Sequence, residues 1–160
     1  MTDDLLFALT LLTALGCGLV AGVFFAFSTF VMRALSTIAA DAGISAMQRI
    51  NVVVLNRLFL GVFVGTAAIA AATMVVAVAS WSPPRSVLLS IASALYLVGT
   101  FGVTIGFNVP RNNRLAQLAG NSPEAQTYWP VYVREWSLWN HVRTVASLAS
   151  CACSALAMAV

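Results

Sequence analysis

Long apolar runs without charged residues alternate with shorter polar segments along the chain. Three such runs cover 5–32, 58–84 and 86–110, and a fourth, 136–160, contains Arg143 as its one charged residue. A spanning helix needs about 20 mostly apolar residues, so each run is long enough to cross a bilayer. The pattern therefore predicts four transmembrane helices. Their approximate limits are 5–32, 56–81, 86–108 and 136–158.

Two longer polar segments connect these predicted spans. In the first, 33–55, apolar residues recur at helical spacing at Ile44, Met47 and Ile50, which predicts a short amphipathic helix with Asp41 as a candidate cap. The other segment, 109–135, begins next to an Asn-Val-Pro sequence. The residue before a proline avoids the α region, so this sequence predicts the end of the third span at Asn108.

Further along, 120–123 (Gly-Asn-Ser-Pro) predicts a turn followed by a helix start, and 82–84 (Ser-Pro-Pro) predicts a tight turn between the second and third spans. Together these signals predict an all-α polytopic membrane protein. We expect one domain over 1–160, folded as a four-transmembrane-helix bundle with short amphipathic helices in its two longer loops.

Composition supports a membrane protein and excludes two other classes. Hydrophobic residues make up 61% of the chain and charged residues 8%, against roughly 25% charged in an ordinary soluble domain. So few charged side chains could not cover the core of a water-soluble monomer, and disordered chains lack such an apolar content. No basic run or repeated basic and aromatic pattern indicates nucleic-acid binding.

The distribution of arginine predicts an orientation in the membrane. Every basic side chain other than His141 is arginine, and six of the eight lie in or beside 33–55 and 109–135. By the positive-inside rule these two loops are cytoplasmic and both termini lie outside, in a bacterial-type inner or cell membrane. The six arginines are Arg33, Arg49, Arg57, Arg111, Arg114 and Arg134.

Polar residues gather at the predicted cytoplasmic ends of the helices. Buried amides and arginines at such a depth are costly unless they face the bundle interior, a cavity or one another. We therefore expect either a common pocket or, as the simpler alternative, helix caps and side chains that reach the interface. The residues concerned are Gln48, Asn51 and Asn56 before the second span, Asn108 and Asn112 at the end of the third, and Trp136, Asn140, Arg143 and Ser147 on one face of the fourth.

Aromatic residues crowd the same end and also have two interpretations. An interfacial belt explains many of them, and a flat aromatic ligand would need the same walls. His141, the single histidine, is either an interfacial residue or a proton acceptor, because its unperturbed pKa suits proton transfer near neutrality. One histidine and three scattered cysteines supply no metal site, so no metal is expected.

Four segments resemble the anthrone oxygenase-like family of small four-helix membrane proteins. The resemblance extends over nearly the whole chain, in the order of the family. It implies oxidation of an anthrone to an anthraquinone by O2 with no known cofactor. The segments are AGVFFAFS at 21–28, MQRIN at 47–51, NVPRN at 108–112 and WSLWNHVRT at 136–144.

The chemistry that this resemblance implies assigns a role to each candidate residue. The reaction needs a base, donors for an enolate oxygen and a dry aromatic slot, and its partners would be a hydrophobic aromatic small molecule, O2 and the lipid bilayer. His141, Asn140 and Arg143 are expected to be catalytic, with His141 as the base. The substrate-binding candidates are Gln48, Asn51, Asn108, Asn112, Trp136, Trp139 and Phe27.

An alternative is a membrane protein without catalysis, either a subunit of a membrane complex or a small-molecule carrier. Proton-coupled export by a four-helix carrier needs a carboxylate within the membrane, but each Asp and Glu lies outside the predicted spans or at their ends. A haem protein is disfavoured because a single histidine cannot supply two axial ligands. The sequence leaves a homo-oligomer open.

Overall fold

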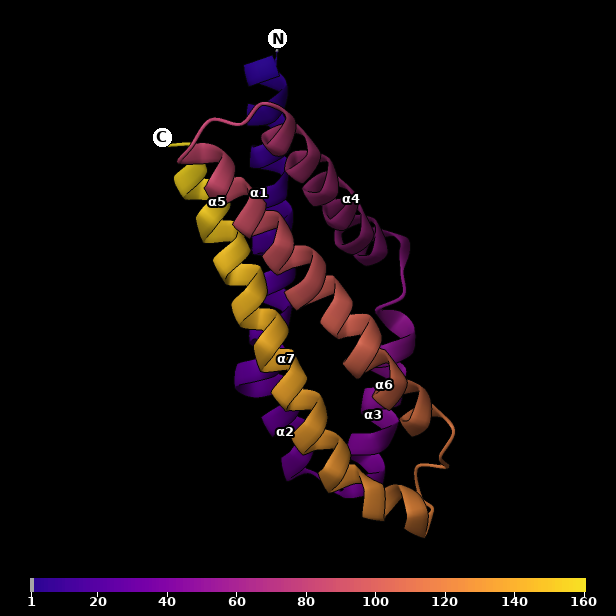
Figure 1. Cartoon of the computed structure of the whole chain (residues 1–160). Coiled ribbons are helices and arrows are strands. Elements are labelled where there is room, and N and C mark those ends of the chain that lie inside the picture. Colours follow the sequence, from indigo (N-terminus) through magenta and orange to yellow (C-terminus); the bar gives the residue numbers. More distant parts are fainter. Residues whose placement is uncertain (1) are drawn as a thin grey trace.

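The computed structural model describes residues 2–160, and every element in that part of the chain is helical (Figure 1). Most elements are α-helices, and three segments are π-helices, labelled η. In chain order they are α1 (Thr2–Ala26), η1 (Phe27–Val31), α2 (Met32–Thr37), α3 (Ala40–Val53), α4 (Arg57–Ala79), α5 (Arg85–Ala94), η2 (Leu95–Gly102), η3 (Thr104–Asn108), α6 (Val109–Ala116) and α7 (Pro123–Ala157).

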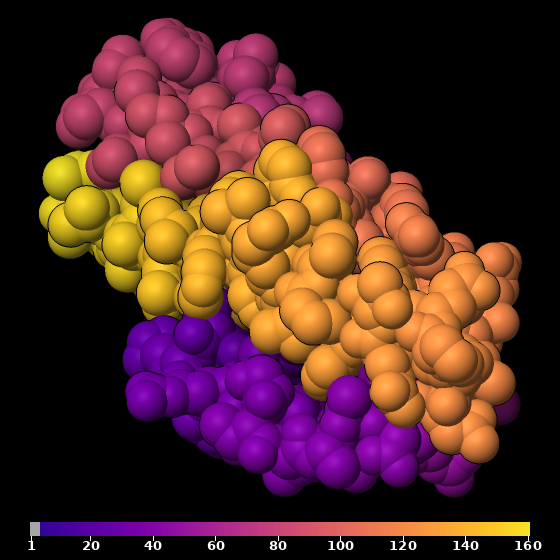
Figure 2. Space-filling view, turned by 90° about the horizontal axis from the view of Figure 1, so that it is seen from below, coloured from indigo at the N-terminus to yellow at the C-terminus, as the bar shows by residue number. Residues whose placement is uncertain are grey.

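Four long helical rods run up and down the molecule. The first is formed by α1, η1 and α2, the second by α4, the third by α5 through α6, and the fourth by α7. The amino and carboxyl ends lie at one end of the bundle, and α2, α3 and α6 lie at the other (Figure 1). The last helix packs against both α1 and α5 and lies between the first and third rods (Figure 2).

Glycine permits the closest approaches between these rods. A Cβ atom built on Gly99 in η2 would lie 2.6 Å from the Cβ of Ala146 in α7, and one on Gly16 in α1 would meet the side chain of Thr66 in α4. No side chain fits at either position without movement of its neighbour. The third rod therefore contacts α7 almost backbone to backbone, as helices in lipid commonly do.

By length and composition, three helical segments within the described residues could span a membrane: Asp4–Thr37, Arg57–Ala79 and Arg85–Ala116. The fourth long helix, α7, is not among them, so the predicted fourth span is not confirmed and stays a prediction. Several polar side chains of its carboxyl-terminal half are buried in the bundle, among them Asn140 and Ser147, which are fully buried. Such residues lower the mean hydropathy of α7 although they do not face its outer surface.

Several predicted boundaries need correction. The helix does not end at Asn108 but continues to Ala116, because Pro110 falls in the first turn of α6, where a missing N–H costs least. The amphipathic helix predicted in 33–55 is present as α3, but Ala39 is its N-cap and no side chain caps it. The helix start predicted at 120–123 is confirmed, since Ser122 caps α7 by accepting a hydrogen bond from the Ala125 amide at 3.2 Å, and the helix runs on from there into the predicted fourth span.

Candidate functional site

A cavity of about 450 Å³ lies where η1, α3, α4 and the third rod meet α7. Its volume falls within the roughly 300–1,000 Å³ typical of small-molecule sites. Its walls are mainly aromatic and aliphatic, and a few amides and one guanidinium interrupt them. The aromatic lining residues are Phe24, Phe27, Phe59, Phe63, Phe101 and Trp136, and the polar ones are Gln48, Asn51, Thr104, Asn112, Asn113 and Arg143.

Arg143 is the one charged residue of this lining, and it is 5% exposed. Its guanidinium is held between two rings, with Cζ 4.0 Å from the ring centroid of Phe24 and 4.8 Å from that of Trp136. Such cation–π contacts become stronger when the cation is desolvated. Among the side chains of residues 4–160, no carboxylate lies within ion-pair distance of this guanidinium. The cavity therefore contains a buried positive charge without a negative partner.

Asn140 fixes the orientation of Arg143. The Nε atom of Arg143 donates a hydrogen bond to Oδ1 of Asn140 at 3.0 Å, and Nη1 donates a longer one to Oγ1 of Thr104 at 3.4 Å. The Nδ2 atom of Asn140 in turn donates to the Phe24 carbonyl at 2.8 Å and to Oγ of Ser28 at 2.7 Å. Asn140 thereby connects α7 to the first rod. The Nη2 atom of Arg143 has no hydrogen-bond acceptor among the described residues.

A second group of polar side chains lies beside the cavity near α3 and α6. Oδ1 of Asn112 accepts two hydrogen bonds, from the Tyr132 hydroxyl at 2.9 Å and from Nε1 of Trp136 at 2.8 Å. Asn51 donates to the same hydroxyl at 3.4 Å. Burial raises the pKa of Tyr132, so this hydroxyl stays protonated and remains a donor. Gln48 lies nearby and donates to the carbonyls of Leu115 and Leu118.

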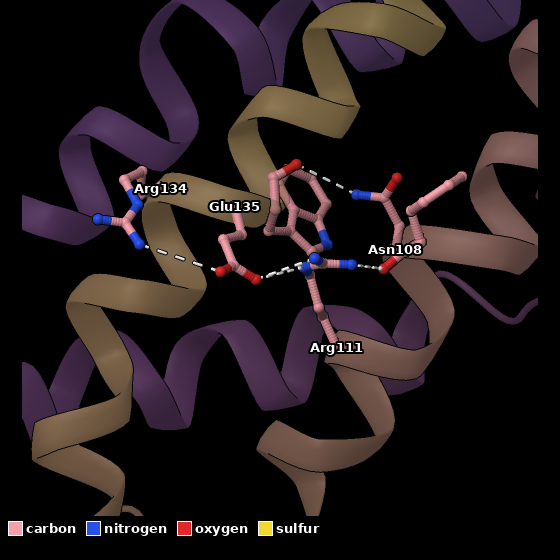
Figure 3. A network of polar contacts seen from close by, with 6 residues as sticks. Asn108, Arg111, Arg134 and Glu135 are labelled. Carbon is pink, nitrogen blue, oxygen red and sulfur yellow. Dashed lines mark hydrogen bonds and ion pairs between the residues drawn. The ribbon is translucent and has the colours of Figure 1, made fainter.

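An ion-pair network anchors the third rod to α7 beside this group (Figure 3). Arg111 contacts the carboxylate of Glu135 at 2.9 Å and also donates to the Phe107 carbonyl at 2.8 Å. Asn108 donates to the Trp136 carbonyl at 3.2 Å. Its own Oδ1 is buried and has no hydrogen-bond partner among the described residues. These contacts position the indole of Trp136, which forms part of the cavity wall.

The structure brings most of the predicted site residues together. Seven of them either line the cavity or, in the case of Asn140, hold a lining residue from behind. They are Phe27, Gln48, Asn51, Asn112, Trp136, Asn140 and Arg143.

Three predicted residues do not line the cavity. Asn108 is buried against α7, and Trp139 stacks on Phe107 with ring centroids 3.6 Å apart. His141 is exposed and makes no hydrogen bond to another described residue. It lies two positions from Arg143 on α7, so its side chain points almost oppositely. The position of His141 therefore does not support its predicted role as the base.

Other lining residues were not predicted from the sequence. Phe59 and Phe63 stack on one face of α4 with centroids 5.9 Å apart, while Phe101 and Thr104 belong to the π-helical part of the third rod. The spacing of the two phenylalanines by four residues was a usable signal, because it places both on one helix face. Nothing in the sequence indicated the π-helices, which are frequent at functional sites and here surround the cavity.

Comparison with known protein families identifies one family. Residues 56–153, more than half of the chain, match the profile of the family described as anthrone oxygenase. No curated protein and no solved structure matched the chain. Within the described residues, no group of three or more His, Cys, Asp or Glu side chains is placed to hold a metal ion.

Proposed function

The chain belongs to the anthrone oxygenase family, and from this premise we propose that it oxidises an anthrone-like, enolisable polycyclic aromatic to a quinone with O2 and without a cofactor. The family supports an oxygenase-like function in general. The observation that carries the specific proposal is the buried cation of Arg143, which faces an aromatic cavity and has no carboxylate partner among residues 4–160.

An unpaired buried guanidinium favours an anionic ligand. Removing a charge from water is costly unless an opposite charge or good hydrogen bonds compensate for it. The enolate of a polycyclic ketone would supply that negative charge on an oxygen, while its fused rings would fill the space between Phe27, Phe63 and Trp136. By analogy with other preorganised donors, such stabilisation is worth about 3 kcal/mol. Arg143 would thus lower the pKa of the bound substrate.

The reaction follows from this ionisation and balances as CH2 plus O2 giving C=O plus H2O. The central CH2 group loses a proton, and the resulting enolate transfers one electron to O2. The carbon radical and superoxide then join through a new C–O bond as a peroxide anion, which takes up a proton. Loss of the second C–H proton breaks the O–O bond and leaves the quinone carbonyl and hydroxide.

The first proton is assigned to solvent rather than to His141. The residues that line the cavity include no carboxylate and no imidazole. Because Arg143 would favour ionisation of the substrate, water or hydroxide at the polar side of the cavity would be a strong enough base to accept the proton. The amide groups of Asn51 and Asn112 border that side and would hold such a water or a second oxygen of the substrate.

The proposal includes a topology. We place α7 as a fourth span, with both termini outside and the segments 33–55 and 109–135 in the cytoplasm. Exposed apolar side chains of α7 support this assignment, since Leu138, Val145 and Leu148 point outward. In this arrangement the cavity lies in the cytoplasmic half of the membrane, where a poorly soluble tricyclic substrate would be concentrated.

The experiment that tests the proposed function is O2 consumption by the purified protein in detergent, with anthrone as substrate and correction for its autoxidation. We expect acceleration by the protein and one O2 consumed per quinone formed. An Arg143→Gln protein that folds normally should lose the acceleration. If wild-type protein does not accelerate the reaction but binds anthraquinone, the non-catalytic alternative of a binding or carrier protein replaces this proposal.

A further inference from the structure

The cavity has one wall that the bundle does not complete. On the side between α4 and η3, five lining residues are large, apolar and exposed: Val52, Leu55, Val64, Ile105 and Val109. These five residues are called the mouth. We propose that the cavity opens through the mouth sideways into the bilayer, and that its ligand enters from the lipid rather than from water.

The packing of α4 explains why this side is open. This helix packs closely on α1, α5 and η2, but it has few or no contacts with η3 and α6. In Figure 1 the end of α4 near α3 stands apart from the third rod. Val52 of the last turn of α3 and Leu55 of the connection to α4 complete the mouth at this end.

The mouth lies at the cytoplasmic edge of the proposed membrane region: Val64 and Ile105 fall within that region, whereas Val52, Leu55 and Val109 belong to the segments placed in the cytoplasm. Val64 lies in the candidate span Arg57–Ala79, and Ile105 lies in Arg85–Ala116. They are 49% and 55% exposed, so their side chains face whatever surrounds the bundle at that level. Around a spanning helix this surrounding is hydrocarbon, and an opening lined by valine, leucine and isoleucine costs nothing to expose there.

The mouth and Arg143 together define the class of ligand. A molecule that reaches the guanidinium through an apolar opening needs an acidic oxygen at one end and an apolar remainder that can stay in contact with lipid. Resting on the proposed function, we identify the acidic end with the enolate of the substrate. A substituent on the ring system, such as an alkyl chain, would then extend through the mouth.

The opening can be tested without any turnover. Full-length protein in phosphatidylcholine vesicles is irradiated with a phosphatidylcholine that carries a diazirine in its acyl chain, and labelled residues are mapped by mass spectrometry. Acyl chains that enter the mouth should label Phe24 and Phe63, which line the cavity but are only 4% and 6% exposed. Absence of label on both in the wild-type protein would overturn the proposal.

Matched variants test whether acyl chains enter the cavity through the mouth. Val64→Trp and Ile105→Trp narrow the mouth from exposed positions and should abolish labelling of Phe24 and Phe63. Val75→Trp, on α4 at a 66% exposed position outside the cavity lining, should leave it unchanged. Should a narrowed variant fold poorly, Val64→Ala with Ile105→Ala widens the mouth and should increase the labelling. Labelling that none of these changes alters would contradict access through the mouth.

A separate measurement addresses the ligand class. A hydroxyanthraquinone with a long alkyl chain, which cannot be oxidised further in this way, should compete with the photolipid and protect Phe63. Competition would support a membrane-dissolved aromatic ligand. Labelling without competition would support the lateral opening but contradict an aromatic ligand. The opening and the proposed function can therefore fail independently.

Discussion

The guanidinium of Arg143 lies over the ring of Phe24, with Cζ 4.0 Å from the ring centroid. Asn140 holds both partners, since it accepts a hydrogen bond from Nε of Arg143 and donates one to the Phe24 carbonyl. The guanidinium is therefore held in place by the Phe24 ring of α1 and the Asn140 amide of α7, not by a carboxylate. Because no carboxylate in the part of the chain with described side chains, 4–160, pairs with this guanidinium, its charge stays available to a ligand.

Replacement of Arg143 should lower oxygenase activity far more than stability. We expect Arg143→Gln to reduce kcat by about 10²–10³-fold, the effect of losing a preorganised donor to a developing oxyanion. Arg143→Lys should restore part of the loss, because it keeps the charge but not the planar group that fits between two rings. O2 uptake measures the rate, and thermal unfolding in detergent provides the control for folding. A fully active Arg143→Gln protein would contradict the role of the cation.

A carboxylate placed beside Arg143 should inhibit the site. Thr104 accepts a hydrogen bond from Nη1 of Arg143, so Thr104→Asp would bring an anion to the guanidinium and satisfy the charge internally. We expect loss of anthrone oxidation and of anthraquinone binding, with unfolding temperature unchanged or raised. Thr104→Asn is the matched neutral control, similar in size, and should retain most activity. Equal behaviour of the two variants would show that the unpaired charge is not needed.

Loss of the single histidine should have little effect. His141 is exposed and outside the cavity lining, so His141→Ala should leave kcat within about twofold of wild type and should change the free energy of unfolding by less than about 0.5 kcal/mol. The dependence of kcat on pH between 6 and 8 should also be unchanged. A loss of activity in a normally folded His141→Ala protein would instead restore His141 as the base.

Two glycines of the third rod offer a matched test of packing. Gly99→Ala would place a methyl group 2.6 Å from the Cβ of Ala146, which cannot move without its backbone. Overpacking of this kind costs roughly 1–3 kcal/mol, and we expect a lower unfolding temperature in detergent. Gly106→Ala meets nothing within 4 Å and should be neutral or slightly stabilising, since alanine favours the helix. Equal stability of the two variants would argue against the close contact of η2 with α7.

Much of the cavity could be predicted from residue types and spacing. Amides and an arginine in otherwise apolar segments are costly, and that cost led to two alternatives, a common pocket at one end of the bundle or helix caps and side chains that reach the interface. Gln48, Asn51, Asn112 and Arg143 do line one cavity. His141 does not line this cavity, and its role as the base stays a prediction, because chemical suitability for proton transfer says nothing about the direction of a side chain on its helix.

The sequence alone determined the helical class, the membrane character and the family, because long uncharged runs and local motifs are properties of neighbouring residues. Only the tertiary structure decided which faces meet. The continuation of the third rod through Pro110, the π-helices around the cavity and the opening between α4 and η3 all depend on contacts between distant segments. Those contacts follow from close packing between particular residues, such as the backbone of Gly99 against the Cβ of Ala146, and no local pattern encodes them.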